Sequence, residues 1–307
     1  MMKWEKVKHL YCPDNNYEWM KTHAANPVPY VLDSDKGIVR IYFSCRDARN
    51  RSSIAYADFD FLNDFKMLKI ADKPLISPGE PGFFDDDGVS VSWIIPVKDK
   101  FYLYYLGWNL RLNVPWLNTI GLAVSESVDG PFRKYQNVPV LDRSNEDPFT
   151  VSYPCVIFDN GIFRMWYGSN LAWGSEQADM AHVIKYAESL DGINWDRANK
   201  VHIPFVHKGE YALSKPCVVK FEDGYKMWYS YRASERTEKY RIGMATSADG
   251  YVWERKDDEV GIDVSTHGWD SISIEYPNVF RLNDNLYMLY NGNDYGKTGF
   301  GLARLTR

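Results

Sequence analysis

The chain has 307 residues, of which 45% are hydrophobic, 25% are charged and 16% are aromatic, and its formal net charge is −5. This is the composition of an ordinary globular protein, and the negative charge argues against a nucleic-acid partner, because neutralising phosphates requires a basic face. The first residues lack the apolar run of a signal peptide, and no segment approaches the roughly 18 apolar residues of a membrane span. We therefore expect a cytoplasmic protein with neither a nucleic-acid nor a membrane partner.

The four cysteines show no metal-binding pattern. Cys12, Cys45, Cys155 and Cys217 are widely spaced, whereas zinc sites commonly use pairs of cysteines a few residues apart. Cys155 and Cys217 each follow a Pro in a repeated strand, where a small buried hydrophobic side chain fits. The sequence therefore predicts a reduced setting, no metal site and no cofactor.

One strand pattern recurs along the whole chain. A strand led by Pro is followed by a Tyr-rich strand. In three copies the leading Pro and a Tyr of the second strand lie 13 positions apart: Pro154 and Tyr167, Pro216 and Tyr229, Pro277 and Tyr290. Two earlier copies follow the same plan. The five copies begin at Pro27, Ser92, Pro154, Pro216 and Pro277. A period of about 60 residues with four short strands is typical of a propeller blade.

The first three strands of each four-stranded copy are separated by turn-forming residues. In chain order they cover 26–30, 39–43 and 54–57; 91–95, 101–105 and 120–123; 153–156, 165–167 and 184–187; 215–218, 227–229 and 242–245; and 276–279, 288–290 and 300–303. The Ser-x-Asp-Gly-x-x-Trp stretches at 189–195 and 247–253 are expected to be structural turns, stabilised by bonds from Asp to the backbone.

The fourth strand of the last copy is expected to come from the N-terminus. The chain ends after the third strand of that copy, and Trp4-Glu5-Lys6 matches Trp195-Asp196-Arg197 and Trp253-Glu254-Arg255 in the outer strands of earlier copies. Pairing of residues 1–10 with the last copy would remove a free sheet edge. The sequence thus predicts an all-β fold: one five-bladed β-propeller domain over residues 1–307, with four-stranded antiparallel blades.

Polar residues collect at one end of this predicted ring. The inner strands of a propeller run in one direction, so their first residues and the loops after the second strands surround the same mouth of the channel. The candidates for substrate binding there are His23, Asn26, Arg46, Asp47, Trp108, Tyr153, Lys215, Arg232, Tyr276 and Asn293. A ligand site and a purely structural cluster of ion pairs both remain open, as does an internal pair between Arg46 and Asp47.

The repeat resembles the five-bladed glycosidase superfamily, which includes glycoside hydrolase families 43, 32 and 130. The likeness rests on the Pro-led inner strands, the Tyr-rich second strands and the Asp-Gly turns, and it covers nearly the whole chain. In families 43 and 32 it would imply an Asp at each of the first two inner strands and a Glu two residues before a Pro at the third. Here the first position is Asn26, and the third reads Ser152-Tyr153-Pro154, with no acid.

Two carboxylates are nevertheless available for glycosidic chemistry, which needs one protonated acid and one ionised carboxylate. The Glu-x-Pro pattern occurs as Glu275-Tyr276-Pro277 in the fifth copy, and Asp86 and Asp87 precede the second inner strand. We expect Glu275 to be the general acid and Asp87, or its neighbour Asp86, to be the base.

The sequence thus predicts a glycoside hydrolase acting on a small glycan at the channel mouth. Arg46, Lys215 and Arg232 suggest an acidic or phosphorylated sugar. Two alternatives stay open: a phosphorylase that uses phosphate, and a propeller that binds a glycan without cleaving it. The sugar, its linkage and the oligomeric state do not follow from the sequence.

Overall fold

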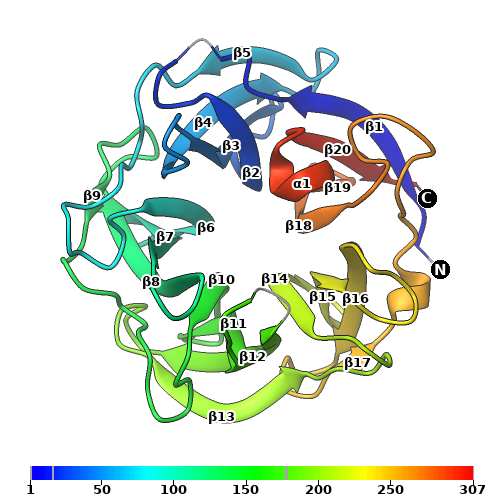
Figure 1. Ribbon diagram of the computed structural model, residues 1–307. Helices are drawn as coiled ribbons and strands as arrows, with labels where there is room; N and C mark the ends of the chain where they lie inside the picture. Colours follow the sequence, from blue (N-terminus) through cyan, green and yellow to red (C-terminus); the bar gives the residue numbers. More distant parts are fainter. Residues whose placement is uncertain (1, 16, 177–178, 307) are drawn as a thin grey trace.

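Strands arranged around a central axis make up almost all of the structure (Figure 1). The structure is a computed structural model, and it describes residues 2–15, 17–176 and 179–306. Consecutive strands form antiparallel groups of four, and every strand expected from the repeat lies within an observed strand. The fold is therefore all-β, as the sequence predicts.

The groups follow the order of the sequence repeats. The first contains β2 (Thr22–Asp33), β3 (Ile38–Arg46), β4 (Ser52–Asp60) and β5 (Lys66–Ile70). The second contains β6 (Gly88–Val97), β7 (Lys100–Leu110), β8 (Trp116–Ser125) and β9 (Arg133–Lys134). The third contains β10 (Val151–Asp159), β11 (Ile162–Ala172), β12 (Ala181–Ser189) and β13 (Asp196–Ile203). The fourth contains β14 (Ala212–Phe221), β15 (Gly224–Arg232), β16 (Arg241–Ser247) and β17 (Glu254–Arg255), followed by the 3₁₀ turn η2 (Asp257–Glu259).

The last group combines both ends of the chain. It contains β18 (Glu275–Leu282), β19 (Asn285–Asn291) and β20 (Phe300–Leu305), with the short helix α1 (Asn293–Gly296) between the last two. Strand β1 (Trp4–Tyr11) pairs antiparallel with β20, so that Trp4 lies opposite Leu305. The two termini accordingly lie close together (Figure 1). The predicted pairing of the N-terminal strand with the last group is present.

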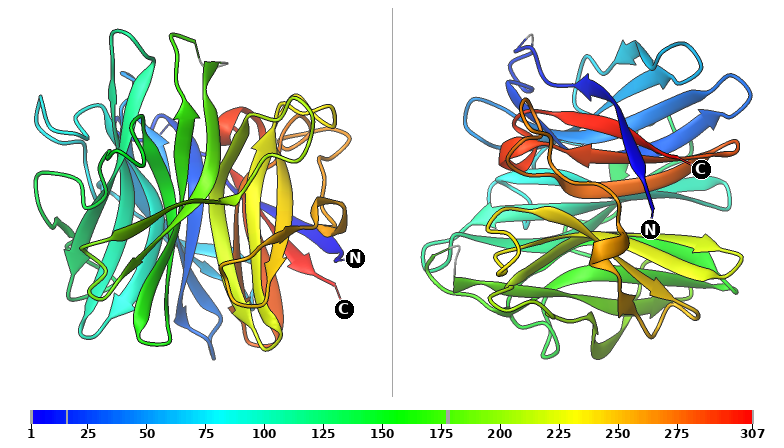
Figure 2. Two further views of the ribbon diagram at one scale, coloured as in Figure 1. Left: turned by 90° about the horizontal axis from the view of Figure 1, so that it is seen from below. Right: turned by 90° about the vertical axis from the view of Figure 1, so that its right-hand side faces the viewer.

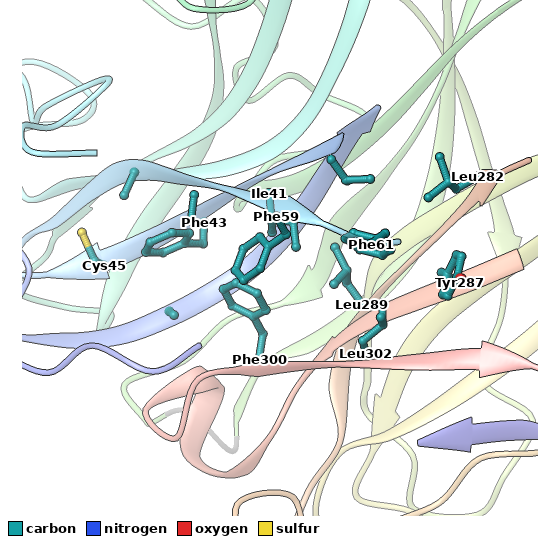
Figure 3. Packing of buried hydrophobic residues seen from close by; sticks show 14 of the residues in the cluster. Ile41, Phe43, Cys45, Phe59, Phe61, Leu282, Tyr287, Leu289, Phe300 and Leu302 are labelled. Carbon is teal, nitrogen blue, oxygen red and sulfur yellow. The ribbon is translucent and has the colours of Figure 1, made fainter. Parts of the chain in front are cut away.

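The hydrophobic core lies between neighbouring groups rather than in one central cluster. The cluster between the first and last groups contains Phe43 and Phe59, which face Phe300, Leu289 and other residues of β19 and β20 (Figure 3). A polar contact joins the same two groups: the Asn291 side chain accepts a hydrogen bond from the Asn26 backbone N–H at 2.7 Å. The first and last repeats therefore pack directly on each other.

A buried Asp bound by a Tyr and a cation recurs in the outer part of four groups. The Tyr is the second-strand Tyr of the repeat, and its hydroxyl donates to the carboxylate. The hydroxyl–carboxylate pairs are Tyr105–Asp85 (3.1 Å), Tyr167–Asp147 (2.8 Å), Tyr229–Asp257 (2.6 Å) and Tyr290–Asp270 (3.0 Å). The cations paired with these carboxylates are Lys134 (2.7 Å), Arg197 (3.0 Å), Arg255 (2.7 Å) and Lys6 (2.7 Å).

These clusters explain why the N-terminal strand fits the last group. Lys6 in β1 forms an ion pair with Asp270. Arg197 and Arg255, in the outer strands of earlier groups, pair in the same way with Asp147 and Asp257. The Trp-acid-cation sequence shared by these strands thus supplies the cation of three of the four clusters, whereas Lys134 of the second group follows Phe132-Arg133. The first group has Phe43 in place of the Tyr and therefore lacks the hydroxyl.

Two further observations concern partners and turns. In the part of the chain that the structure describes, no helix has the length and apolar character needed to cross a membrane. The Asp-Gly turns are structural, as predicted: the carboxylate of Asp191 accepts backbone N–H bonds from Ile193 and Asn194, both at 2.8 Å. Bonds of this kind hold the pKa of Asp191 at about 2, against the effect of its burial.

Candidate active site

A cavity of about 360 Å³ opens at the end of the ring where the inner strands begin. Its walls come from the first residues of β2, β6, β10, β14 and β18 and from the ends of β3, β7 and β11. The long hairpins β7–β8 and β11–β12 extend beyond the other strands at one end (Figure 2), and they supply Leu110, Trp116 and Met180 to the wall. The volume suits a small organic ligand.

Aromatic rings form much of the cavity wall. Tyr276 lies between Tyr153 and Tyr240, with ring centroids 5.6 Å and 6.1 Å away. Trp108 also lines the cavity, where its indole N–H donates to the Ser52 hydroxyl at 2.7 Å. Trp116 is held by Trp173, whose ring lies 5.0 Å away. Flat aromatic faces next to polar groups suit the alternating apolar and hydroxyl surfaces of a sugar.

Several of the residues that line the cavity have a left-handed backbone conformation near the start of an inner strand. The residue before the Pro has a positive φ in four inner strands, at Asn26 (55°), Tyr153 (42°), Lys215 (53°) and Tyr276 (56°). Each lies at or beside a shift in strand register. This conformation is costly for residues other than Gly, and a following Pro disfavours it further. Strained bulges of this kind are concentrated at functional sites, where they redirect side chains.

Glu275 begins β18 and is almost fully buried, with 1% of its surface exposed. Its Oε1 accepts a hydrogen bond from the Tyr295 backbone N–H at 2.7 Å, and Tyr295 and Tyr276 both line the cavity. Burial raises the pKa of Glu275 to about 8, although this N–H and the charge of Arg232 act in the opposite direction. The carboxyl group is thus protonated at neutral pH and sits behind the cavity wall.

Asp86 and Asp87 are not among the residues that line the cavity. One oxygen of Asp86 accepts the Gly82 backbone N–H at 2.8 Å, and one oxygen of Asp87 accepts the Leu110 backbone N–H at 2.7 Å. Leu110 is part of the wall, so Asp87 lies near the rim. Among the described residues that line the cavity, none carries a carboxylate.

The other predicted binding residues divide into two sets. Five of them line the cavity: Asn26, Arg46, Trp108, Tyr153 and Tyr276. Arg46 donates to Asn50 at 2.8 Å, while Asp47 forms its ion pair with Arg51 at 3.0 Å, so the internal pair between Arg46 and Asp47 is absent.

Asp47 and four further predicted residues are not among those that line the cavity. His23 bonds the neighbouring Thr22 hydroxyl at 2.9 Å, and burial lowers its pKa to about 4. Asn293 holds the segment before β18, because its oxygen accepts the Ile272 and Ser273 N–H groups. Lys215 is fully buried and donates to the Ser92 carbonyl oxygen at 3.0 Å. Arg232 lies buried against Tyr240 and Tyr295.

His182, Tyr240 and Tyr295 are among the wall residues that sequence reasoning missed. His182 belongs to the start of β12, and Tyr240 directly precedes β16. Third strands begin at the same end of the ring as inner strands. A search that included the residues at the start of each third strand would therefore have found His182 and Tyr240. Tyr295 lies in α1, whose left-handed residues no repeat position predicts.

The comparisons with known proteins agree with this architecture. No family model matches the chain. The chain is 46% identical over 304 residues to the uncharacterised protein MT1551 of Mycobacterium tuberculosis (strain CDC 1551 / Oshkosh), covering 99% of both chains. It is 30% identical over 129 residues to a 1,2-beta-oligomannan phosphorylase of Thermoanaerobacter sp. (strain X514), covering 40% of this chain and 44% of that protein.

Solved structures with similar folds come from glycan-active proteins. One described as a glycoside hydrolase has a TM-score of 0.76 and 16% identity, covering 99% of this chain and 92% of its own. Another, from a study of mannoside phosphorylases and glycoside hydrolases of the GH130 family, has a TM-score of 0.73 and 14% identity, covering 99% and 93%. The chain therefore belongs to the same family as the Mycobacterium tuberculosis protein MT1551, and its fold is that of the propeller glycosidases.

Proposed function

We propose that this protein is an enzyme that cleaves a glycosidic bond in the aromatic cavity, with Glu275 as the general acid. The observation that carries the proposal is a protonated, buried carboxyl group directly behind two tyrosines of the wall. Since Oε1 accepts the Tyr295 N–H, Oε2 is free to carry the proton. That proton would pass to the glycosidic oxygen as the bond to the anomeric carbon breaks.

The scaffold belongs to the same proposal. We infer that the groups of four strands are the five blades of one propeller domain spanning residues 1–307, and that β1 closes the ring. Pairing of β1 with β20 and packing of the first group on the last support this inference. A closed ring would hold residues from all five inner strands around one ligand.

The group that attacks the anomeric carbon distinguishes two candidate reactions. In hydrolysis, Asp87 at the rim would activate a water molecule, although its carboxylate already accepts the Leu110 N–H. In phosphorolysis, phosphate itself attacks and needs no protein base. Two observations favour phosphorolysis: the described wall residues contain no carboxylate, and Arg46 lines the cavity without a carboxylate partner among the described ion pairs. The similarity to an oligomannan phosphorylase points the same way.

The test is turnover of aryl glycosides and of oligosaccharides, including β-1,2-linked manno-oligosaccharides, with and without phosphate. Release of a sugar phosphate only in the presence of phosphate would select phosphorolysis, and release of free sugar in its absence would select hydrolysis. Binding without turnover would select the non-catalytic alternative.

Variants test the roles of the acids. Glu275→Gln should lower kcat at least about 100-fold with an unchanged melting temperature, because the amide cannot donate a catalytic proton. Exposed Glu254 offers a matched control as Glu254→Gln, which should keep full activity. Asp87→Asn should abolish hydrolysis but leave phosphorolysis largely intact. Full turnover by Glu275→Gln would eliminate the proposed acid.

A further inference from the structure

Arg232, the last residue of β15, is a buried cation without a carboxylate partner in the described part of the chain. It is 8% exposed, and only one of its nitrogens, Nη1, has a hydrogen-bond acceptor, the Tyr295 hydroxyl at 2.6 Å. Nε and Nη2 are buried and donate to nothing among the described residues. Buried N–H groups of an ionised side chain are rarely left in this state.

Aromatic rings around Arg232 compensate its charge only in part. The guanidinium carbon lies 4.7 Å from the ring centre of Tyr240, 5.3 Å from that of Tyr211 and 5.9 Å from that of Tyr295. These contacts attract a cation to the ring faces, but they accept none of its in-plane N–H groups. The nearby acid Glu275 does not supply the missing charge, because burial raises its pKa to about 8 and keeps it protonated at neutral pH.

His182, on the same row of the sheet, is a second buried side chain with a nitrogen that has no partner among the described residues. It lines the cavity, is 9% exposed, and its Nε2 has no hydrogen-bond partner among the described residues. Burial, followed by the charge of Arg232, lowers the pKa of His182 to about 3. The ring is therefore neutral, and its Nε2 can carry a proton and act as a donor.

Ala212 separates these two side chains. It lies opposite His182 on β12 and opposite Arg232 on β15, so the three residues occupy one row across β12, β14 and β15. Residues opposite one another on paired strands point to the same face of the sheet. The Ala side chain is a single methyl group, so no long side chain at this position of the row separates the imidazole from the guanidinium.

We propose that an oxyanion, the carboxylate of an acidic sugar or a phosphate, binds between His182, at the wall of the cavity, and Arg232, which contacts Tyr240 and Tyr295 of that wall. Nε and Nη2 of Arg232 would donate to its oxygens, and Nε2 of His182 would donate from the other side of Ala212. The inference rests on the proposed function in one respect: the anion belongs to the glycan that is cleaved or to the phosphate that cleaves it.

The test measures binding by calorimetry without any turnover. D-Glucuronate, glucose 6-phosphate and inorganic phosphate are titrated into the full-length protein, with glucose as the neutral control. Arg232→Met and His182→Leu should each weaken anion binding about 10- to 100-fold, as expected for a lost charge-assisted or buried hydrogen bond. Arg236→Gln is the matched control, since exposed Arg236 already pairs with Asp258, and it should change the affinity less than twofold.

The outcomes separate the sources of the anion. If only the two sugar anions bind, and both variants lose this binding, the anion is a group carried by the glycan. If inorganic phosphate binds, the anion is a phosphate co-substrate. Anion binding that is absent, or that both variants retain, overturns the inference. Arg232→Met should melt no lower than wild type, because it removes an uncompensated buried charge, and His182→Leu keeps the test valid if that variant fails to fold.

The result is independent of catalysis. If the anions bind through His182 and Arg232 but no glycoside is cleaved, the proposed function fails and this inference stands. If glycosides are cleaved but neither variant affects anion binding, the inference fails and the proposed function stands.

Discussion

Replacing Lys6 by Met tests whether the N-terminal strand stabilises the last group through its ion pair. The Lys6 side chain is 27% exposed and that of Asp270 only 2%, and their charged atoms lie 2.7 Å apart. Removing one partner of a buried pair costs about 3–5 kcal/mol, since the other charge is left uncompensated. Because Lys6 is partly exposed, we expect the low end, a loss of about 3 kcal/mol in the free energy of unfolding.

The assay is urea unfolding followed by tryptophan fluorescence. The matched control is Glu5→Gln in the same strand. Glu5 pairs with Arg304 at 3.1 Å, and the side chains of Glu5 and Arg304 are 55% and 44% exposed. Exposed pairs contribute at most about 1 kcal/mol. In an Asp270→Asn background, Lys6→Met should cost much less than in the wild type. If Lys6→Met costs no more than the control, the buried cluster does not hold β1 in place and the reasoning is refuted.

The remaining predictions concern the ring and the two buried titratable groups at its centre. Deleting residues 1–10 removes β1 and leaves the edge of β20 unpaired, so the melting temperature should fall further than in Lys6→Met; an unchanged melt would contradict ring closure by β1. Turnover should fall as the pH rises through about 8, because burial raises the pKa of Glu275 to that value and the acid form is then lost; a rate that is level on both sides of this pH would exclude Glu275 as the acid. Burial lowers the pKa of Lys215 from 10.5 to about 8, so burying its charge destabilises the folded state below pH 8. Lys215→Met should therefore raise the free energy of unfolding by about 3 kcal/mol at neutral pH, and this gain should shrink as the pH rises from 8 to 10.5; denaturation curves at several pH values measure it.

The scaffold could be predicted from the sequence because the same physical requirements recur in every repeat. The interval between Pro154 and Tyr167 is set by a strand, a turn and a second strand that places the Tyr hydroxyl on Asp147. The match between Trp4-Glu5-Lys6 and Trp253-Glu254-Arg255 arose from the same cause, since each strand must supply a cation to a buried carboxylate.

The candidate site could be predicted only in part, because it depends on departures from the repeat. Glu275, Tyr153 and Tyr276 could be singled out because they lie one or two residues before a repeated Pro, and of these Tyr153 and Tyr276 line the cavity. The sequence does not reveal that Asp87 turns back to the Leu110 N–H, since this depends on how the preceding loop folds over β7. Nor does it reveal that His182 on β12 comes near Arg232 on β15, since the two strands are brought together only through β14.

The left-handed residue before Pro in four inner strands has a consequence for how such a ring can diversify. The backbone shape is repeated, but the residues that adopt it are Asn26, Tyr153, Lys215 and Tyr276, which differ in size, charge and polarity. The inner ends of the strands therefore keep one geometry while tolerating different side chains. New ligand preferences could arise by exchanging one residue at a time at these positions, with no change in the strand pairing that supports them.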